Sequence, residues 1–270
     1  WFISKNMIPD SSPYYFNNSN QINSPSLIVY PSIIEDNIEN ALKLITGKNT
    51  FLCPHVKTIK SKEPIYMAMQ RGIRSFKCST LNEAELLGVV GVDHALICYQ
   101  MTEDKMENLA SIKSSYNGTS FATVVDNFES AKMLFNYFNG KHTEVYIDVD
   151  SGMHRTGLTI DKVPDLVEEI KHLNGLTIGG IHCYDGHVHD LDEEVRKKDA
   201  EEIYKNLLKL KEGLQASLGK KLRLVLGGSP SFPFYAKKSN VSCSPGTFFL
   251  WDYGYGKNFP EIPFKPAALI

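Results

Sequence analysis

Strand-like and helix-like segments alternate along nearly the whole chain, and this alternation most constrains its fold. We expect strands at residues 51–55, 75–79, 94–99, 121–125, 145–150, 178–184, 222–226 and 241–249. Apolar residues three and four apart predict helices at 81–90, 105–113, 127–138, 163–173 and 191–218, with Asn127 and Asp161 as N-caps. Eight strands, each followed by a helix, favour a parallel (β/α)8 TIM-like barrel of the α/β class; an open eight-stranded sheet is the alternative.

Segments at both ends are surplus to such a barrel. Residues 46–258 are the expected barrel, residues 1–45 carry an earlier strand (26–30) and an amphipathic helix (32–44), and residues 259–270 begin another strand. We interpret the two end strands as parts of one C-terminal β-domain that is largely missing here. The chain starts without methionine and ends in the apolar Ala268-Leu269-Ile270, so we expect it to be a piece of a longer protein.

Composition argues against several classes of partner. A net charge of -2 predicts no nucleic-acid or membrane binding, and no apolar run reaches the roughly 18 residues of a membrane helix. The first residues, Trp1 to Asn6, lack the layout of a signal peptide. The five cysteines are odd in number and all fall in strand-like segments, which is typical of buried free thiols in a reducing compartment. We therefore expect a cytoplasmic protein.

Lys57 is the strongest candidate for chemistry. It closes the run Phe51-Leu52-Cys53-Pro54-His55-Val56-Lys57, where a strand ends and a helical stretch follows. A partly desolvated lysine has a lowered pKa and is a better nucleophile toward an aldehyde. A solvated surface lysine is the alternative. His55 is either a base or a hydrogen-bonded histidine at the strand end.

Other polar residues follow other strands and should meet Lys57 at the C-terminal mouth of the barrel. Arg155 lies in the loop Gly152-Met153-His154-Arg155-Thr156-Gly157, and Tyr184 ends the sixth strand. Two glycine–hydroxyl loops, Gly227-Gly228-Ser229-Pro230-Ser231 and Ser244-Pro245-Gly246-Thr247, offer backbone N–H and hydroxyl donors to a phosphate. A phosphorylated aldehyde, pyridoxal 5′-phosphate (PLP), would use all of these groups.

These residues also carry a family resemblance. The motifs Pro54-His55-Val56-Lys57-Thr58, Asp150-Ser151-Gly152-Met153-His154-Arg155-Thr156-Gly157 and Ser244-Pro245-Gly246-Thr247 resemble the alanine racemase type barrel, and most nearly its D-threonine aldolase and D-serine dehydratase branch. The resemblance covers residues 26–270. It implies Lys57 as the Schiff-base lysine, Arg155 near the cofactor phenolate or substrate carboxylate, and Tyr184 as the ring-stacking side chain. It implies a phosphate cradle of Gly228, Ser229, Gly246 and Thr247, with Ser231 as a weaker member.

The chain departs from the family pattern at three points. Cys53 and Ile59 replace an arginine and a second histidine of the aldolase and dehydratase branch. Ser244 replaces the arginine that keeps the pyridine nitrogen unprotonated in alanine racemases, so the resemblance implies a neutral partner there and argues against a plain racemase. The metal pair of the branch lies on the β-domain, so a divalent metal (Zn or Mn) is expected only with residues outside this chain, and none of its own residues is assigned to metal.

We therefore expect a PLP-dependent lyase that acts on D-β-hydroxy-amino acids, as an aldolase or a dehydratase, with Lys57, Arg155, Tyr184 and His55 as catalytic residues. The alternatives are a non-catalytic PLP-binding homeostasis barrel and an amino-acid racemase. The resemblance also suggests a homodimer.

Several residues keep two interpretations. Arg155 is either part of the site or a surface ion-pair partner, Tyr184 either stacks on a ring or plugs the barrel, and Gly227-Gly228 is either a phosphate loop or only a turn. His187 and His189 are either a metal pair or loop residues. Asp148 and Asp150 are either a general acid pair or, for Asp148, an inward group that orients its neighbours. The charged run 193–211 is interpreted as a solvated helix face.

Overall fold

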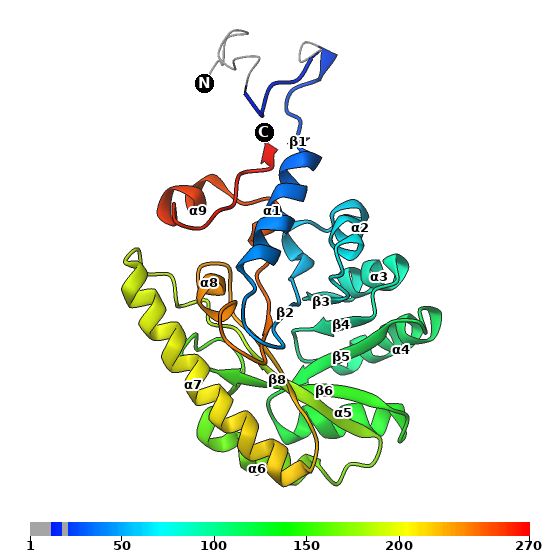
Figure 1. Ribbon diagram of the computed structural model, residues 1–270. Coiled ribbons are helices and arrows are strands. Elements are labelled where there is room, and N and C mark those ends of the chain that lie inside the picture. The colour runs from blue at the N-terminus through cyan, green and yellow to red at the C-terminus, as the bar shows by residue number, and fades with distance from the viewer. Residues whose placement is uncertain (1–11, 18–20) are drawn as a thin grey trace.

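The computed structural model describes residues 12–17 and 21–270, and its core is a nearly closed parallel barrel (Figure 1). The barrel strands are β2 (Phe51–Leu52), β3 (Ser75–Cys78), β4 (His94–Ile97), β5 (Ser120–Val125), β6 (Thr143–Asp150), β8 (Leu176–Cys183), β9 (Arg223–Leu226) and β10 (Ser242–Cys243). Their spatial order is β2-β10-β9-β8-β6-β5-β4-β3, and every neighbouring pair is parallel. The short strand β7 (Leu158–Thr159) pairs with the end of β6. The predicted barrel is confirmed.

One bridge joins the two ends of this strand order. His55, just after β2, pairs in parallel with Lys77 of β3, and the N–H of Lys77 donates to the carbonyl of Pro54 at 2.9 Å. An open sheet would leave β2 and β3 on opposite edges, so this contact excludes that alternative. It also places the segment that carries Lys57 beside the end of β3.

Helices follow most strands and cover the outside of the barrel. They are α1 (Pro31–Leu44), α2 (Lys62–Gln70), α3 (Leu81–Val90), α4 (Met106–Ser115), α5 (Phe128–Phe138), α6 (Val163–Ile170), α7 (Glu193–Leu218), α8 (Phe232–Tyr235) and α9 (Tyr253–Asn258), with the 3₁₀ turns η2 (Val56–Thr58), η3 (Glu103–Lys105), η4 (Ile160–Lys162) and η5 (Thr247–Phe249). Figure 1 shows α2, α3 and α4 lying in sequence along one side of the strands.

Side-chain caps explain several helix starts. Asn127 caps α5 as predicted, because its Oδ1 accepts from the N–H of Ser130 at 2.8 Å. The prediction for Asp161 was wrong: it lies inside η4, and Lys162 holds the N-cap position of α6. The predicted strand 241–249 was too long, since β10 ends at Cys243. Pro245 has no N–H for the ladder, and the chain then turns into η5.

Two apolar layers form the core. The larger cluster fills the space between strands and helices. The smaller one consists of Cys53, Leu96, Cys98, Ala122, Val124, Tyr146 and Val225. On β4, Leu96 belongs to the smaller cluster while Ala95 and Ile97 belong to the larger one, so the smaller cluster faces the barrel interior. All five cysteines are free and buried, as the sequence predicted.

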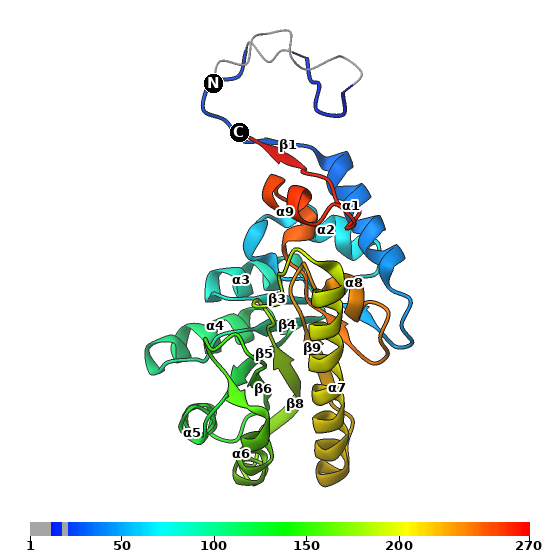
Figure 2. The same cartoon turned by 90° about the vertical axis from the view of Figure 1, so that its left-hand side faces the viewer.

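The two end strands meet outside the barrel. β1 (Ile28–Val29) pairs antiparallel with β11 (Ala268–Leu269), and Figures 1 and 2 both show this pair above the barrel, next to the start of α1. The pairing agrees with the idea that the two strands belong together, while the division into three regions stays a prediction. Residues 1–11 and 18–20, including the Trp1 to Asn6 segment, lie outside the described residues.

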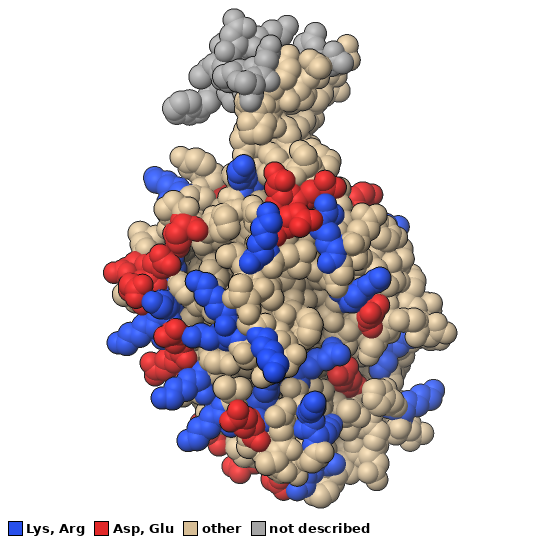
Figure 3. All heavy atoms as spheres, in the orientation of Figure 1, with Lys and Arg blue, Asp and Glu red and all other residues tan. Residues whose placement is uncertain are grey.

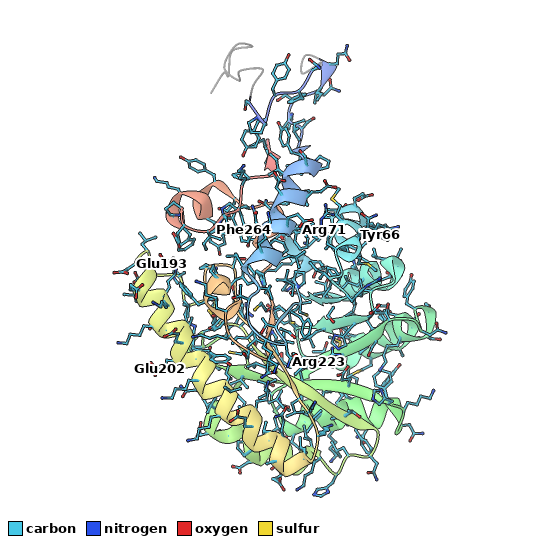
Figure 4. The ribbon with its side chains drawn as sticks, viewed as in Figure 1. Tyr66, Arg71, Glu193, Glu202, Arg223 and Phe264 are labelled. Atoms are coloured by element: carbon cyan, nitrogen blue, oxygen red, sulfur yellow. The ribbon has the colours of Figure 1, made fainter. Side chains whose placement is uncertain are left out.

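Charged side chains are distributed over the surface without a large area of one sign on the face shown in Figure 3. On α7, Glu193 and Glu202 point outward as predicted for a solvated face (Figure 4). Arg196 and Lys211 contradict that prediction, because both are buried. Arg196 donates to the carbonyl of Asp190 at 2.6 Å and pairs with Glu261, so it ties α7 to the C-terminal segment. Within the described residues, every helix is too short or too polar to span a bilayer.

We predict that Asn37 stabilises the junction of α1 with the C-terminal segment. Its buried amide donates to the carbonyls of Phe249 at 3.3 Å and Lys265 at 2.8 Å, and its oxygen accepts from the N–H of Lys265 at 2.9 Å. Asn37→Ala leaves these backbone groups unpaired and should lower the free energy of unfolding by about 2 to 4 kcal/mol.

Asn40 on the same helix is the matched control. It makes one exposed bond to the carbonyl of Pro263 at 2.9 Å, so Asn40→Ala should cost at most about 1 kcal/mol. Urea unfolding followed by circular dichroism measures both variants. Equal losses would show that the buried amide has no special role.

Candidate active site

A cavity of about 1200 Å³ opens at the C-terminal ends of the strands. Four of the predicted site residues line it together: His55, Lys57, Arg155 and Tyr184. A second cavity, of about 790 Å³, is lined by residues at the other ends of the strands, such as Ser75 and His94, and contains none of the predicted site residues. Parallel strands that close into a barrel bring their C-terminal loops to one rim. Residues distant in the sequence therefore share the first cavity.

Lys57 sits in the 3₁₀ turn η2, and its side chain lies in the cavity. The Nδ1 of His55 accepts from the backbone N–H of Lys57 at 3.1 Å and caps this turn. Partial desolvation lowers the pKa of the Lys57 amine, and the charges of Lys77 and Arg155 lower it further. The cavity thus holds an accessible lysine whose amine is more nucleophilic than an ordinary surface lysine.

Tyr184 presents its ring to three cations. Arg155 Cζ lies 4.9 Å from the ring centroid, Lys57 Nζ 5.4 Å and Lys77 Nζ 5.7 Å. The ring is half-buried and lines the cavity, so it does not plug the barrel interior. Arg155 is exposed to the cavity and approaches the ring of Tyr99 at 5.8 Å as well. An aromatic face surrounded by positive charge suits a flat ring that carries negative groups.

His55 is held by both of its ring nitrogens. Its Nδ1 accepts from Lys57, and its Nε2 lies 2.9 Å from the hydroxyl of Ser79. Burial, followed by the charges of Lys77 and Lys57, lowers the pKa of this imidazole strongly, so the ring is neutral at physiological pH. This geometry favours the hydrogen-bonded strand-end histidine, whereas the role of base stays a prediction.

The two glycine–hydroxyl loops lie against each other. The hydroxyl of Ser229 accepts from the N–H of Thr247 at 3.1 Å, which joins the loop after β9 to η5. Thr58 donates to the carbonyl of Gly246 at 2.7 Å, so this loop contacts the turn that carries Lys57. A Cβ on Gly246 would come within 3.1 Å of His55, which explains glycine at that position. The predicted cradle and Lys57 are therefore neighbours.

Not every predicted donor of this cradle is free. The N–H of Gly228 donates to the carboxylate of Asp185 at 2.7 Å and to the hydroxyl of Ser231 at 3.2 Å. Ser231 is fully buried and supports the loop from inside. The hydroxyls of Ser229 and Thr247 are among the donors that these loops offer to a phosphate. The predicted cradle residues do not line the cavity of about 1200 Å³ themselves. They adjoin the turn of Lys57 and the ring of Tyr184, and together these groups suit PLP.

The structure also reveals residues that the sequence did not single out. Lys77 of β3 donates to the hydroxyl of Ser244 at 2.8 Å and lies 3.4 Å from Nε2 of His182. His182 Nδ1 lies 2.7 Å from the carboxylate of Asp148, which also accepts from Thr156 at 3.0 Å. Lys77 and His182 interrupt apolar strand runs, and that interruption was the available signal.

This network decides between the interpretations of the two aspartates. Asp148 points inward and orients His182, which is the second alternative named above. Asp150 instead accepts from the N–H groups of Gly152 at 2.9 Å and His154 at 3.0 Å and shapes the loop before Arg155. The prediction of a neutral partner at Ser244 was incomplete, because the ammonium of Lys77 lies next to this serine.

His187 and His189 lie in the loop after β8. His189 Nδ1 is 3.0 Å from the carbonyl of Gly186, and a Cβ on Gly152 would lie 2.9 Å from Nε2 of His187. Within residues 12–17 and 21–270, there is no group of three or more His, Cys, Asp or Glu side chains that could hold a metal ion. His189 makes a loop contact, while for His187, whose buried Nδ1 has no partner among the described residues, both interpretations stay predictions.

Comparison with known proteins bears on the fold and the family. The family model for the alanine racemase N-terminal domain matches residues 30–250. D-threo-3-hydroxyaspartate dehydratase from Delftia sp. (strain HT23) is 25% identical over 175 residues, which are 63% of this chain and 46% of the dehydratase. The chain thus spans less than half the length of this curated relative.

Solved structures share the architecture. The D-threonine aldolase from Filomicrobium marinum matches with a TM-score of 0.79 at 24% identity, over 92% of this chain and 68% of the aldolase. Alanine racemase from Clostridium difficile 630 matches with a TM-score of 0.71 at 16% identity, over 90% of this chain and 66% of the racemase. Because the family model covers nearly the entire barrel, the chain belongs to the alanine racemase N-terminal domain family, whose fold is that of the fold type III PLP enzymes.

Proposed function

We propose that this chain is the PLP-binding barrel of a lyase that acts on D-β-hydroxy-amino acids, as an aldolase or as a dehydratase. PLP is the cofactor expected for this family. The observation that carries the proposal is the accessible Lys57 amine, with its lowered pKa, next to the ring of Tyr184 and the guanidinium of Arg155. The two similar proteins named above, a D-threonine aldolase and a D-3-hydroxyaspartate dehydratase, have β-hydroxylated D-amino acids in their names.

Five residues have a definite task in this proposal: Lys57, Arg155 and Tyr184, which line the cavity, and Ser229 and Thr247 beside it. PLP, when bound, supplies the electron sink that stabilises negative charge at the substrate Cα. Lys57 holds the cofactor aldehyde and carries a proton on its amine once it is released. Arg155 is exposed and binds an anionic oxygen, either the cofactor phenolate or the substrate carboxylate. Tyr184 supports the ring, and Ser229 and Thr247 donate to the phosphate.

The finer expectations from the sequence remain part of this proposal. They are a homodimer, a cytoplasmic location, and a divalent metal held by residues outside this chain. The racemase alternative had weak support in the sequence because Ser244 stands in place of an arginine. The structure adds that Lys77 donates to Ser244, so a basic side chain lies next to that position after all. The homeostasis alternative requires PLP binding without turnover, and a product assay separates it from a lyase.

We predict product formation from D-substrates only. The full-length protein that contains this chain, with PLP and Mn²⁺ or Zn²⁺, should release glycine and acetaldehyde from D-threonine, or a keto acid and ammonia from D-serine or D-3-hydroxyaspartate. The L-enantiomers serve as controls and should give at least about 100-fold less product, because a site that hydrogen-bonds the D-form would leave polar groups unpaired with the L-form. PLP binding without product from any of these D-substrates would favour the homeostasis alternative and contradict the lyase.

We predict a covalent link between PLP and Lys57. Addition of PLP should give an absorbance band near the visible edge, and borohydride reduction should fix the cofactor to the peptide that contains Lys57. Lys57→Ala should abolish both signals. Lys60→Ala is the matched control, because Lys60 lines the same cavity but is well exposed and pairs with Glu83 at 3.9 Å. A reduced adduct on any other lysine would refute the assignment of Lys57.

A further inference from the structure

Lys77 is a buried lysine at the cavity to which neither the sequence nor the proposed mechanism gives a role. Only 2% of it is exposed, although it lines the same cavity as Lys57. A buried ammonium costs free energy unless its charge is paired and its protons are hydrogen-bonded. Both of its side-chain partners, Ser244 and His182, are neutral hydrogen-bond acceptors. Its positive charge is therefore not cancelled by either group that it contacts.

The partners are arranged so that they accept from Lys77. Ser244 uses its own proton to donate to the carbonyl of Gly227 at 2.9 Å, which leaves its lone pairs for the ammonium. The Nδ1–H of His182 donates to the carboxylate of Asp148, so Nε2 is left as an acceptor. Burial and the charge of Lys77 lower the pKa of His182, in agreement with a neutral ring. Two of the three N–H groups of the Lys77 ammonium thus donate hydrogen bonds, and these fix the position of its nitrogen.

Lys57 is the group on which this charge acts. Both amines approach the ring of Tyr184, Lys57 at 5.4 Å and Lys77 at 5.7 Å from its centroid. After desolvation, Lys77 is the largest contributor to the lowered pKa of Lys57, ahead of Arg155. The thiol of Cys98 and the carboxylate of Glu83 act in the opposite direction and more weakly.

The other charged groups around Lys57 cannot replace Lys77. Arg155 is exposed, so solvent screens it and an anionic ligand neutralises it. Lys60 is exposed and paired with Glu83. His55 is a neutral ring. Asp148 is separated from Lys77 by the imidazole of His182, so it orients the network without a direct ion pair. Lys77 is the buried member of this set, and two hydrogen bonds hold it in place.

We propose that Lys77 is a second functional lysine of this site: a positioning residue whose ammonium group, held by Ser244 and by the Asp148–His182 pair, favours the nucleophilic form of the Lys57 amine. The proposal deepens the proposed function, since a nucleophilic Lys57 is what a cofactor aldehyde requires. The effect itself belongs to the chain alone and can be measured without PLP.

The test is competitive acetylation of the full-length protein after bound PLP has been removed with hydroxylamine. Acetic anhydride is added over a range of pH, and peptide mass spectrometry reports how fast Lys57 reacts relative to exposed lysines. Lys77→Met removes the buried charge and should make Lys57 react about tenfold more slowly near neutral pH, because a neighbouring unit charge inside a protein changes a protonation equilibrium by about that factor. The pH at which Lys57 becomes reactive should rise.

Two controls separate charge from structure. Lys77→Arg keeps the charge and should preserve most of the reactivity of Lys57, which a role through side-chain shape would not predict. Lys60→Met removes an exposed, paired cation from the same cavity and should change the reactivity of Lys57 by less than about twofold. If Lys77→Met does not fold, Lys77→Gln makes the same measurement, because its amide still reaches polar partners without a charge.

The outcomes are distinct from those of the PLP assays. Unchanged Lys57 reactivity in a folded Lys77→Met or Lys77→Gln variant would overturn the role of Lys77, even if PLP binds to Lys57. Equal slowing by Lys77→Arg would overturn it as well. Slowing by the neutral variants alone would support it, even if the protein turned out to bind another aldehyde.

Discussion

The site depends on the contact that closes the barrel. The bridge between His55 and Lys77 joins the first strand of the barrel to the second, and the N–H of Lys77 donates to the carbonyl of Pro54. Without this contact the turn that carries Lys57 would be fixed to β10 and the loop after it, but not to β3. The residues that close the sheet therefore also place Lys57 and Lys77 near each other, so barrel closure determines both the fold and the arrangement of the site.

Electrostatics then explains why the cavity is suited to one kind of ligand. Three cations, Lys57, Lys77 and Arg155, approach the face of Tyr184. Partial desolvation, and after it the like charges of Lys77 and Arg155, lower the pKa of the Lys57 amine. The buried charge is kept in place by neutral acceptors, while the exposed guanidinium remains available to an anion. An aldehyde with anionic substituents suits this cavity, because the amine of Lys57 can react with the aldehyde and the guanidinium of Arg155 can bind an anionic group.

Much of this arrangement could be predicted from the sequence. The eight strands are apolar runs bounded by polar or glycine-rich segments, and Lys57, Arg155 and Tyr184 follow three of them. Parallel barrels place such residues at one rim, so their shared cavity was predictable. Lys77 and His182 were not predicted, because a lone polar residue in an apolar strand looks the same whether it faces the helices or the barrel interior. Likewise, the charged run of α7 gave no sign that Arg196 would be buried against Glu261.

The amino-acid sequence alone determined the number and order of the strands, the helix start at Asn127, and the residue types that follow each strand, because local periodicity and capping depend on neighbours in the chain. Only the tertiary structure decided which polar side chains face one another. Barrel closure brings β3, β8 and β10 together, and this places Lys77 between Ser244 and His182, which are more than a hundred residues away in the chain. Burial and charge proximity, which set the reactivity of Lys57, exist only once those strands have met.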